Sequence, residues 1–72
     1  MLYKKQFIEN LGNNVRKLRS EKKISIEKLS IKSGISYSQL IRIEKGKINT
    51  SIYQLYQIAH HLEVKLEDFF TE

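Results

Sequence analysis

The spacing of hydrophobic residues along this chain predicts helices and no strands. Near the start, Phe7, Leu11, Val15 and Leu18 recur every three or four residues, which places them on one face of a helix. This helix is expected to begin near residues 2–4 and to run to about residue 22. Further helical segments are expected at residues 26–33, between Ser36 and Gly46, after Ser51, and at residues 66–70. The pattern therefore indicates an all-α fold, a compact bundle of five helices.

Serine residues mark the expected beginnings of three of these helices. Ser25, Ser36 and Ser51 each precede an apolar segment, and a serine hydroxyl can accept a hydrogen bond from an amide of the first turn. Gln39 and Gln54 follow Ser36 and Ser51 by three residues, the spacing at which both residues bond reciprocally in a capping box. We therefore expect capping boxes at the third and fourth helices.

The glycines are expected to end helices or to weaken them. Gly34 and Gly46 follow the second and third helices, where a left-handed residue commonly ends a helix. Gly12 lies inside the first helix, where glycine costs about 1 kcal/mol relative to alanine. We expect the N-terminal part of this helix to kink or fray.

Apolar residues at helical spacing predict which faces are buried. Beyond the first helix, the residues expected to face the core are Leu29, Leu40, Ile43, Ile52, Leu55, Ala59 and Leu62. Aromatic residues in the last part of the chain outnumber what one small core needs. We expect a dimer interface there, formed by Tyr53, Tyr56, Phe69 and Phe70, with burial in the core as the alternative.

Composition narrows the class of protein. The 72 residues suffice for a single domain, residues 1–72, and they include no cysteine, which excludes disulfides and thiolate metal sites. No apolar run approaches the roughly 18 residues of a membrane span. These features predict a soluble cytoplasmic protein.

Charge is distributed unevenly along the chain. The net charge is +5, but residues 1–47 hold twelve basic and four acidic residues, a net charge of +8, whereas residues 48–72 hold one basic and four acidic residues, a net charge of −3. Ordinary surface charge is the alternative explanation. Because the basic part contains the third helix, the asymmetry favours a polyanionic partner.

The third helix has a polar and basic face outside its apolar stripe. That face is formed by Tyr37, Ser38, Ile41, Arg42 and Lys45. A short helix that presents hydrogen-bonding and basic side chains after a glycine-containing turn is typical of a helix that enters the major groove of DNA.

Several segments together resemble the Cro/C1-type (XRE-like) helix-turn-helix family of transcriptional regulators. The resemblance covers residues 12–70, and its most specific part is the Ser-x-x-x-Leu-x-x-Ile-Glu-x-Gly run of residues 36–46. It implies a lambda-repressor-like fold with the helix-turn-helix at about residues 25–46. A chain of this length also resembles the controller proteins of restriction–modification systems and short phage-type repressors, and both alternatives stay open.

The resemblance implies a role for several residues. Residues 26–33 would be the positioning helix, and the third helix would be the recognition helix. Contacts with DNA bases are expected from Tyr37, Ser38 and Arg42. Contacts with DNA phosphates are expected from Ser25, Gln39, Lys45 and Lys47. A structural ion pair is expected between Arg19 and Glu44.

The sequence also departs from the family pattern. Ile26 stands where a phosphate-binding glutamine is usual, Ser30 where a small alanine is usual, and Glu63 where a glycine is common. Ile41 has two interpretations, contact with a thymine methyl group or packing against a neighbouring helix. Arg19 and Glu44 have a simpler alternative as unrelated surface charges.

Chemistry other than DNA binding finds little support in the sequence. His60 and His61 are adjacent on a helix and therefore point about 100° apart, so no metal site is expected. No catalytic constellation or phosphate-binding glycine loop is present, so we expect no enzyme, no cofactor and no small-molecule substrate. The predicted function is a sequence-specific regulator of transcription, such as a repressor, that binds double-stranded DNA as a homodimer on a two-fold operator. The alternative is an antitoxin or another protein-interaction module.

Overall fold

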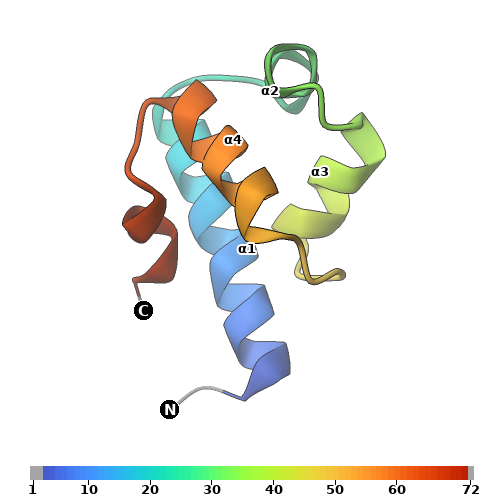
Figure 1. The fold of residues 1–72 in the computed structure, drawn as a ribbon, viewed down its shortest axis with the longest axis vertical. Coiled ribbons are helices and arrows are strands. Elements are labelled where there is room, and N and C mark those ends of the chain that lie inside the picture. Colours follow the sequence, from blue (N-terminus) through green and yellow to red (C-terminus); the bar gives the residue numbers. More distant parts are fainter. Residues whose placement is uncertain (1–2, 72) are drawn as a thin grey trace.

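The computed structural model describes residues 3–71 of the chain, and no strand forms among them. Its elements, in order, are α1 (Lys4–Glu21), α2 (Ile26–Ser33), α3 (Tyr37–Glu44), α4 (Ile52–Leu62) and the 3-10 helix η1 (Leu66–Phe70) (Figure 1). The all-α class is confirmed, with a 3-10 helix as the fifth element. Part of the predicted start of the first helix, residue 2, lies outside the described residues. None of the helices within residues 3–71 combines the length and the apolar character needed to cross a bilayer.

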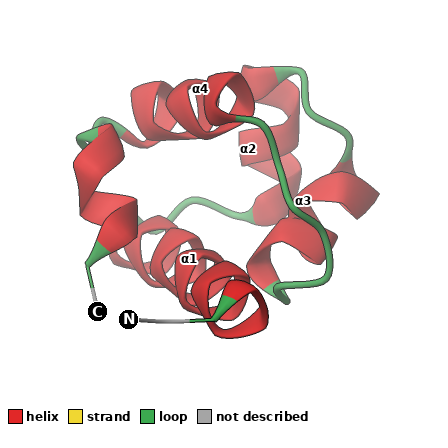
Figure 2. Ribbon diagram, turned by 60° about the horizontal axis from the view of Figure 1, so that its bottom comes forward, coloured by secondary structure: helices red, strands yellow, loops and turns green. Residues whose placement is uncertain are grey.

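The helices surround one core to which every element contributes. Figure 2 shows α1 and α4 along opposite sides, with α2 and α3 at one end and η1 at the other. The buried hydrophobic residues are Leu11, Val15, Leu29, Ile35, Leu40, Ile43, Leu55, Ile58, Ala59, Leu62 and Phe69. Helices as short as α2 and α3 are unstable alone in water, so this shared core is what stabilises them.

Two of the residues predicted to be buried lie at the surface instead. Ile52 is 62% exposed because it is the first residue of α4, and its side chain points back toward the helix N-terminus, beyond the packed core. Ile58, which was not predicted to face the core, is fully buried in it. Phe7 is 43% exposed near the free end of α1, where its ring stacks on that of Phe70.

The predicted serine caps are confirmed. Each serine hydroxyl oxygen accepts a hydrogen bond from the backbone amide three residues later, with N···O distances of 3.0 to 3.2 Å for Ser25–Lys28, Ser36–Gln39 and Ser51–Gln54.

The two predicted capping boxes are wrong in one respect: the glutamine side chains do not accept a hydrogen bond from the backbone amides of Ser36 and Ser51. The side-chain amide of Gln39 donates to Oε1 of Gln54 at 2.6 Å, and the hydroxyl of Thr50 donates to the same oxygen at 2.6 Å. Gln54 therefore receives two bonds from other side chains and does not bond back to its own cap. The two glutamines connect α3 with the beginning of α4.

The glycines at the helix ends are left-handed, as predicted, but the expectation for Gly12 is wrong. Gly34 and Gly46 have φ angles of +77° and +67°. Helix α1 continues through Gly12 without interruption, and this residue is buried where the last turn of α3 crosses α1. A Cβ atom at Gly12 would lie 2.8 Å from the carbonyl oxygen of Glu44 and closer still to that of Ile43. Gly12 therefore allows the two helix backbones to approach closely.

The turn between α2 and α3 explains the serine at position 30. The hydroxyl of Ser30 donates to the carbonyl oxygen of Ile35 at 2.6 Å, and Ser33 Oγ accepts from the amide of Ile35 at 3.2 Å. Ile35 itself is buried in the core. These bonds fix the turn and with it the relative position of α2 and α3.

Candidate nucleic-acid interface

The outward face of α3 carries the residues predicted to contact DNA bases. Tyr37 is 49% exposed, and Ser38, Arg42 and Lys45 are exposed as well. At 100° per residue, these positions fall within about 140° of the helix circumference, and half-buried Ile41 lies among them. The structure thus gathers Tyr37, Ser38 and Arg42 on one accessible face.

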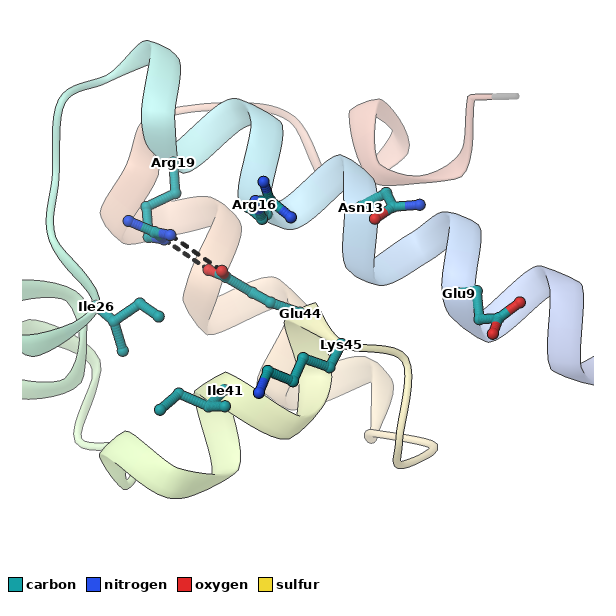
Figure 3. Close-up of a pocket in the computed structure, with 8 residues that line it drawn as sticks. All are labelled: Glu9, Asn13, Arg16, Arg19, Ile26, Ile41, Glu44 and Lys45. Atoms are coloured by element: carbon teal, nitrogen blue, oxygen red, sulfur yellow. Dashed lines mark hydrogen bonds and ion pairs between the residues drawn. The ribbon is translucent and has the colours of Figure 1, made fainter.

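The last turn of α3 is anchored to α1 by an ion pair. Arg19 Nε donates to Glu44 Oε2 at 2.6 Å, and Arg19 Nη2 donates to Glu44 Oε1 at 3.0 Å (Figure 3). The remaining terminal nitrogen of Arg19 donates to the carbonyl oxygen of Ile24 at 2.9 Å. The two side chains are only 15% and 4% exposed. One guanidinium group therefore joins the end of α1, the loop before α2 and the end of α3, and it is not a surface charge.

The residues predicted to contact phosphates occupy different environments. Ser25 is exposed at the beginning of α2, and Lys45 and Lys47 are exposed at the end of α3 and just after it. Gln39 is half-buried, and its hydrogen bond to Gln54 makes it a link between α3 and α4. The sequence offered no sign of this link, because the two glutamines are fifteen residues apart.

An open groove of about 580 Å³ runs between α1, the start of α2 and α3. The residues around it are Glu9, Asn13, Arg16, Arg19, Ile26, Ile41, Glu44 and Lys45 (Figure 3). Ile41 and Ile26 both line this groove, and Ile41 is half-buried. Asn13 and Arg16 were not predicted to belong to the site. The spacing of residues 9, 13 and 16 places them on one helical face, which was the available signal.

The aromatic residues predicted for a dimer interface are not all at the surface. Phe69 is fully buried, so its assignment to an interface is wrong: its ring completes the core beneath η1. Tyr53 and Tyr56 are 65% and 56% exposed. Phe70 is 38% exposed, and its ring centroid lies 6.1 Å from that of Phe7.

The outward face of α4 is unusually apolar for a surface. Ile52, Tyr53, Tyr56 and His60 lie within about 100° of the helix circumference and are all exposed. The buried residues of α4 lie on the other side of the helix. The α4 face, as we call these four residues, is therefore a contiguous apolar and aromatic surface.

The two histidines do not assemble a metal site. The rings of His60 and His61 meet edge to face with centroids 5.1 Å apart. Within residues 3–71, no group of three or more His, Cys, Asp or Glu side chains is placed to hold a metal ion.

Sequence comparisons find helix-turn-helix proteins. The model of a helix-turn-helix domain family matches residues 12–72. An uncharacterized HTH-type transcriptional regulator, y4dJ of Sinorhizobium fredii, is 33% identical over 61 residues, which cover 85% of this chain and 79% of that protein. The HTH-type transcriptional regulator SlrR of Bacillus subtilis is 38% identical over 61 residues, which cover 83% of this chain but only 40% of SlrR.

Solved structures show the same arrangement of helices. The restriction-modification controller protein C.AhdI from Aeromonas hydrophila superimposes with a TM-score of 0.84 at 28% identity, over 88% of this chain and 96% of that one. An HTH_3 family transcriptional regulator from Vibrio cholerae gives a TM-score of 0.88 at 28% identity, over 94% of this chain and 38% of its own.

Proposed function

This chain belongs to the family of helix-turn-helix domains of transcriptional regulators, and we propose that it binds a two-fold DNA operator as a homodimer, with α3 in the major groove. The proposal rests on two features of α3, its exposed polar and basic side chains and its fixed position against α1. Its outward face is polar and basic, and its last turn is fixed to α1 by the buried pair of Arg19 and Glu44. A helix held in this way can present side chains to base edges without being displaced.

Base recognition is assigned to the exposed side chains of α3. An arginine side chain can donate two hydrogen bonds to O6 and N7 of guanine, the commonest specific contact in the major groove. Arg42 is exposed, and it forms no ion pair with any residue among 3–71. Tyr37 and Ser38, on the first turn of α3, add hydroxyl groups for neighbouring bases.

Phosphate binding is assigned to exposed groups around the ends of α2 and α3. Ser25, Lys45 and Lys47 are exposed there and supply one hydroxyl and two ammonium groups. Such contacts give affinity that is independent of sequence and falls with increasing salt concentration. In this proposal the side chain of Gln39 acts instead by holding α3 against α4, through its bond to Gln54.

Exchanging Arg42 and Lys47 for alanine should separate base recognition from phosphate binding. Arg42→Ala should relax the preference at one base position of each half-site, because it removes discrimination of about 1–3 kcal/mol. Lys47→Ala should weaken binding to all sequences alike. It should also reduce the salt slope, the slope of the logarithm of the binding constant against the logarithm of the salt concentration, by about one. Selection of binding sites from a random DNA pool with each variant, together with titrations at several salt concentrations, measures both effects.

Both variants should keep the circular-dichroism spectrum of the original chain, because both side chains are exposed. An Arg42→Ala protein that selects an unchanged site, bound more weakly, would assign Arg42 to the phosphates. A wild-type protein without measurable affinity for any duplex at low salt would refute the proposed function itself and would favour a protein-interaction module.

Dimerisation is assigned to the α4 face. A two-fold operator requires two recognition helices about 34 Å apart, so the contact between protomers must leave α3 free. The α4 face is exposed, apolar and aromatic, and it lies on a different helix from the proposed DNA contacts. Aromatic residues of this kind are enriched at the centres of protein interfaces.

Tyr56→Ala should weaken the dimer, because it removes a large aromatic side chain from the middle of the α4 face. Truncation of a central aromatic residue of an interface often costs 2 kcal/mol or more, roughly a thirtyfold change in the dissociation constant. Sedimentation equilibrium at several protein concentrations measures the change. Tyr37→Ala is the matched control, since Tyr37 is similarly exposed on the DNA-facing side. Equal dimerisation of the two variants would place the interface elsewhere.

A further inference from the structure

We infer that the groove between α1, α2 and α3 binds a backbone phosphate of the DNA, and that Arg16 of α1 is the residue that holds it. The inference rests on the proposed function, because it requires α3 to occupy the major groove. It extends the DNA interface to α1, a helix that contributes none of the contacts assigned above.

The groove is built from three elements that meet beside α3. Glu9, Asn13 and Arg16 lie on one face of α1, at positions i, i+4 and i+7. Ile41 and Lys45 reach the groove from α3, as Figure 3 shows. Ile26 enters from the first turn of α2 with an apolar side chain, so the polar side chains of the groove come from α1 and α3.

The charges in the groove leave a positive excess. Arg19 and Glu44 neutralise each other, and the donors of Arg19 are directed to Glu44 and to the Ile24 carbonyl. The other charged side chains around the groove are Glu9, Arg16 and Lys45. Neither Arg16 nor Lys45 pairs with a carboxylate among the residues that the structure describes. Two cations therefore face one carboxylate, and the amide of Asn13 adds a neutral donor.

The dimensions of DNA explain why a phosphate would reach this groove. The major groove of B-DNA is about 12 Å wide, and a helix with its side chains is about 10–12 Å across. A helix of that width brings the flanking parts of the protein against the phosphate-lined walls. Figure 3 shows α1 and α3 on either side of the residues that line the groove. A guanidinium group there can bind phosphate oxygens with two parallel hydrogen bonds.

The test compares two charge-removing variants of neighbouring residues on α1. Arg16→Gln removes the cation in the groove, whereas Lys17→Gln removes an exposed cation from the next position, which does not line the groove. Affinity for a duplex is measured between 0.05 and about 0.3 M salt for the wild type and both variants. Arg16→Gln should reduce the salt slope by about one and weaken binding about fivefold near 0.15 M salt, while Lys17→Gln should change neither quantity appreciably.

Two further measurements make the outcome decisive. Arg16→Lys should keep the wild-type salt slope, because it retains the charge, and thermal unfolding should show that all variants are folded. If Arg16→Gln and Lys17→Gln have the same slope as the wild type, the inference is wrong, and the proposed function stands. If the wild type does not bind any duplex, the proposed function fails first and the inference with it.

Inorganic phosphate distinguishes a DNA phosphate from a free anion. NMR titration with phosphate at about 10 mM, far above the concentration of protein, reports any binding near Arg16. Saturation of the groove by phosphate, with no competition against the duplex and no change of salt slope in Arg16→Gln, would overturn the DNA assignment.

Discussion

Replacing Glu44 with alanine should leave most of the protein unfolded at room temperature. Glu44 is 6% exposed, and its carboxylate accepts two hydrogen bonds from the nearly buried guanidinium of Arg19. Removing one partner of a buried pair leaves the other charge without compensation, which typically costs about 3–5 kcal/mol. A chain of this length rarely has more than about 3–5 kcal/mol of total stability. Urea unfolding followed by circular dichroism measures the loss.

Two matched variants test whether the loss of stability in Glu44→Ala comes from the broken pair of Arg19 and Glu44. Glu21→Ala removes an exposed glutamate from the end of α1 and should change the stability by less than about 0.5 kcal/mol. The double variant Arg19→Met/Glu44→Met removes both charges and should be more stable than Glu44→Ala alone, because no unpaired charge is left in the core. A Glu44→Ala protein as stable as Glu21→Ala would show that the pair contributes little.

Gly12→Ala should destabilise the protein by about 1–3 kcal/mol, the usual cost of inserting a methyl group where there is no space. Helix propensity alone predicts the opposite, since alanine is favoured over glycine by about 1 kcal/mol inside a helix. The new Cβ would contact carbonyl oxygens of Ile43 and Glu44, which belong to the backbone of α3 and cannot rotate away. The sign of the change therefore tests how closely α1 and α3 approach.

The measurement is again the urea midpoint, with Asn13→Ala as the control. Asn13 is the next residue of the same helix and is exposed, so its replacement reports the propensity effect without the steric one. A Gly12→Ala protein that unfolds at a higher urea concentration than the original chain would mean that α3 is free to move away from α1.

Local patterns predicted the helices well because those patterns act within a few residues. The three serine caps and the left-handed glycines Gly34 and Gly46 depend only on neighbouring backbone groups. The resemblance to Cro/C1-type helix-turn-helix regulators is confirmed by the family match and by the solved structures. The exposed face of α3 likewise follows from helical spacing.

The wrong predictions concern residues whose contacts are with distant parts of the chain. The positions of Gln39 and Gln54 suit capping boxes, but the side chain of Gln39 in α3 donates a hydrogen bond to that of Gln54 in α4. Helix propensity alone predicts that Gly12 weakens α1, but the contact with the backbone of α3 requires a glycine at this position. Phe69 could not be assigned to the core or to an interface by counting aromatic residues. The groove around Arg16 was also hidden, because it exists only through the packing of α1 against α2 and α3.

The anchoring of α3 has a consequence for the entropy of binding. Helix α3 has only eight residues, and a free peptide of that length would be largely disordered. Ordering its backbone during association would cost on the order of 10 kcal/mol, at about 1–2 kcal/mol per residue. The bonds of Glu44 to Arg19 and of Gln39 to Gln54 order the helix when the chain folds, before any DNA is present. Association then has to restrict mainly the exposed side chains, so that even a small contact surface can retain most of its interaction energy as affinity.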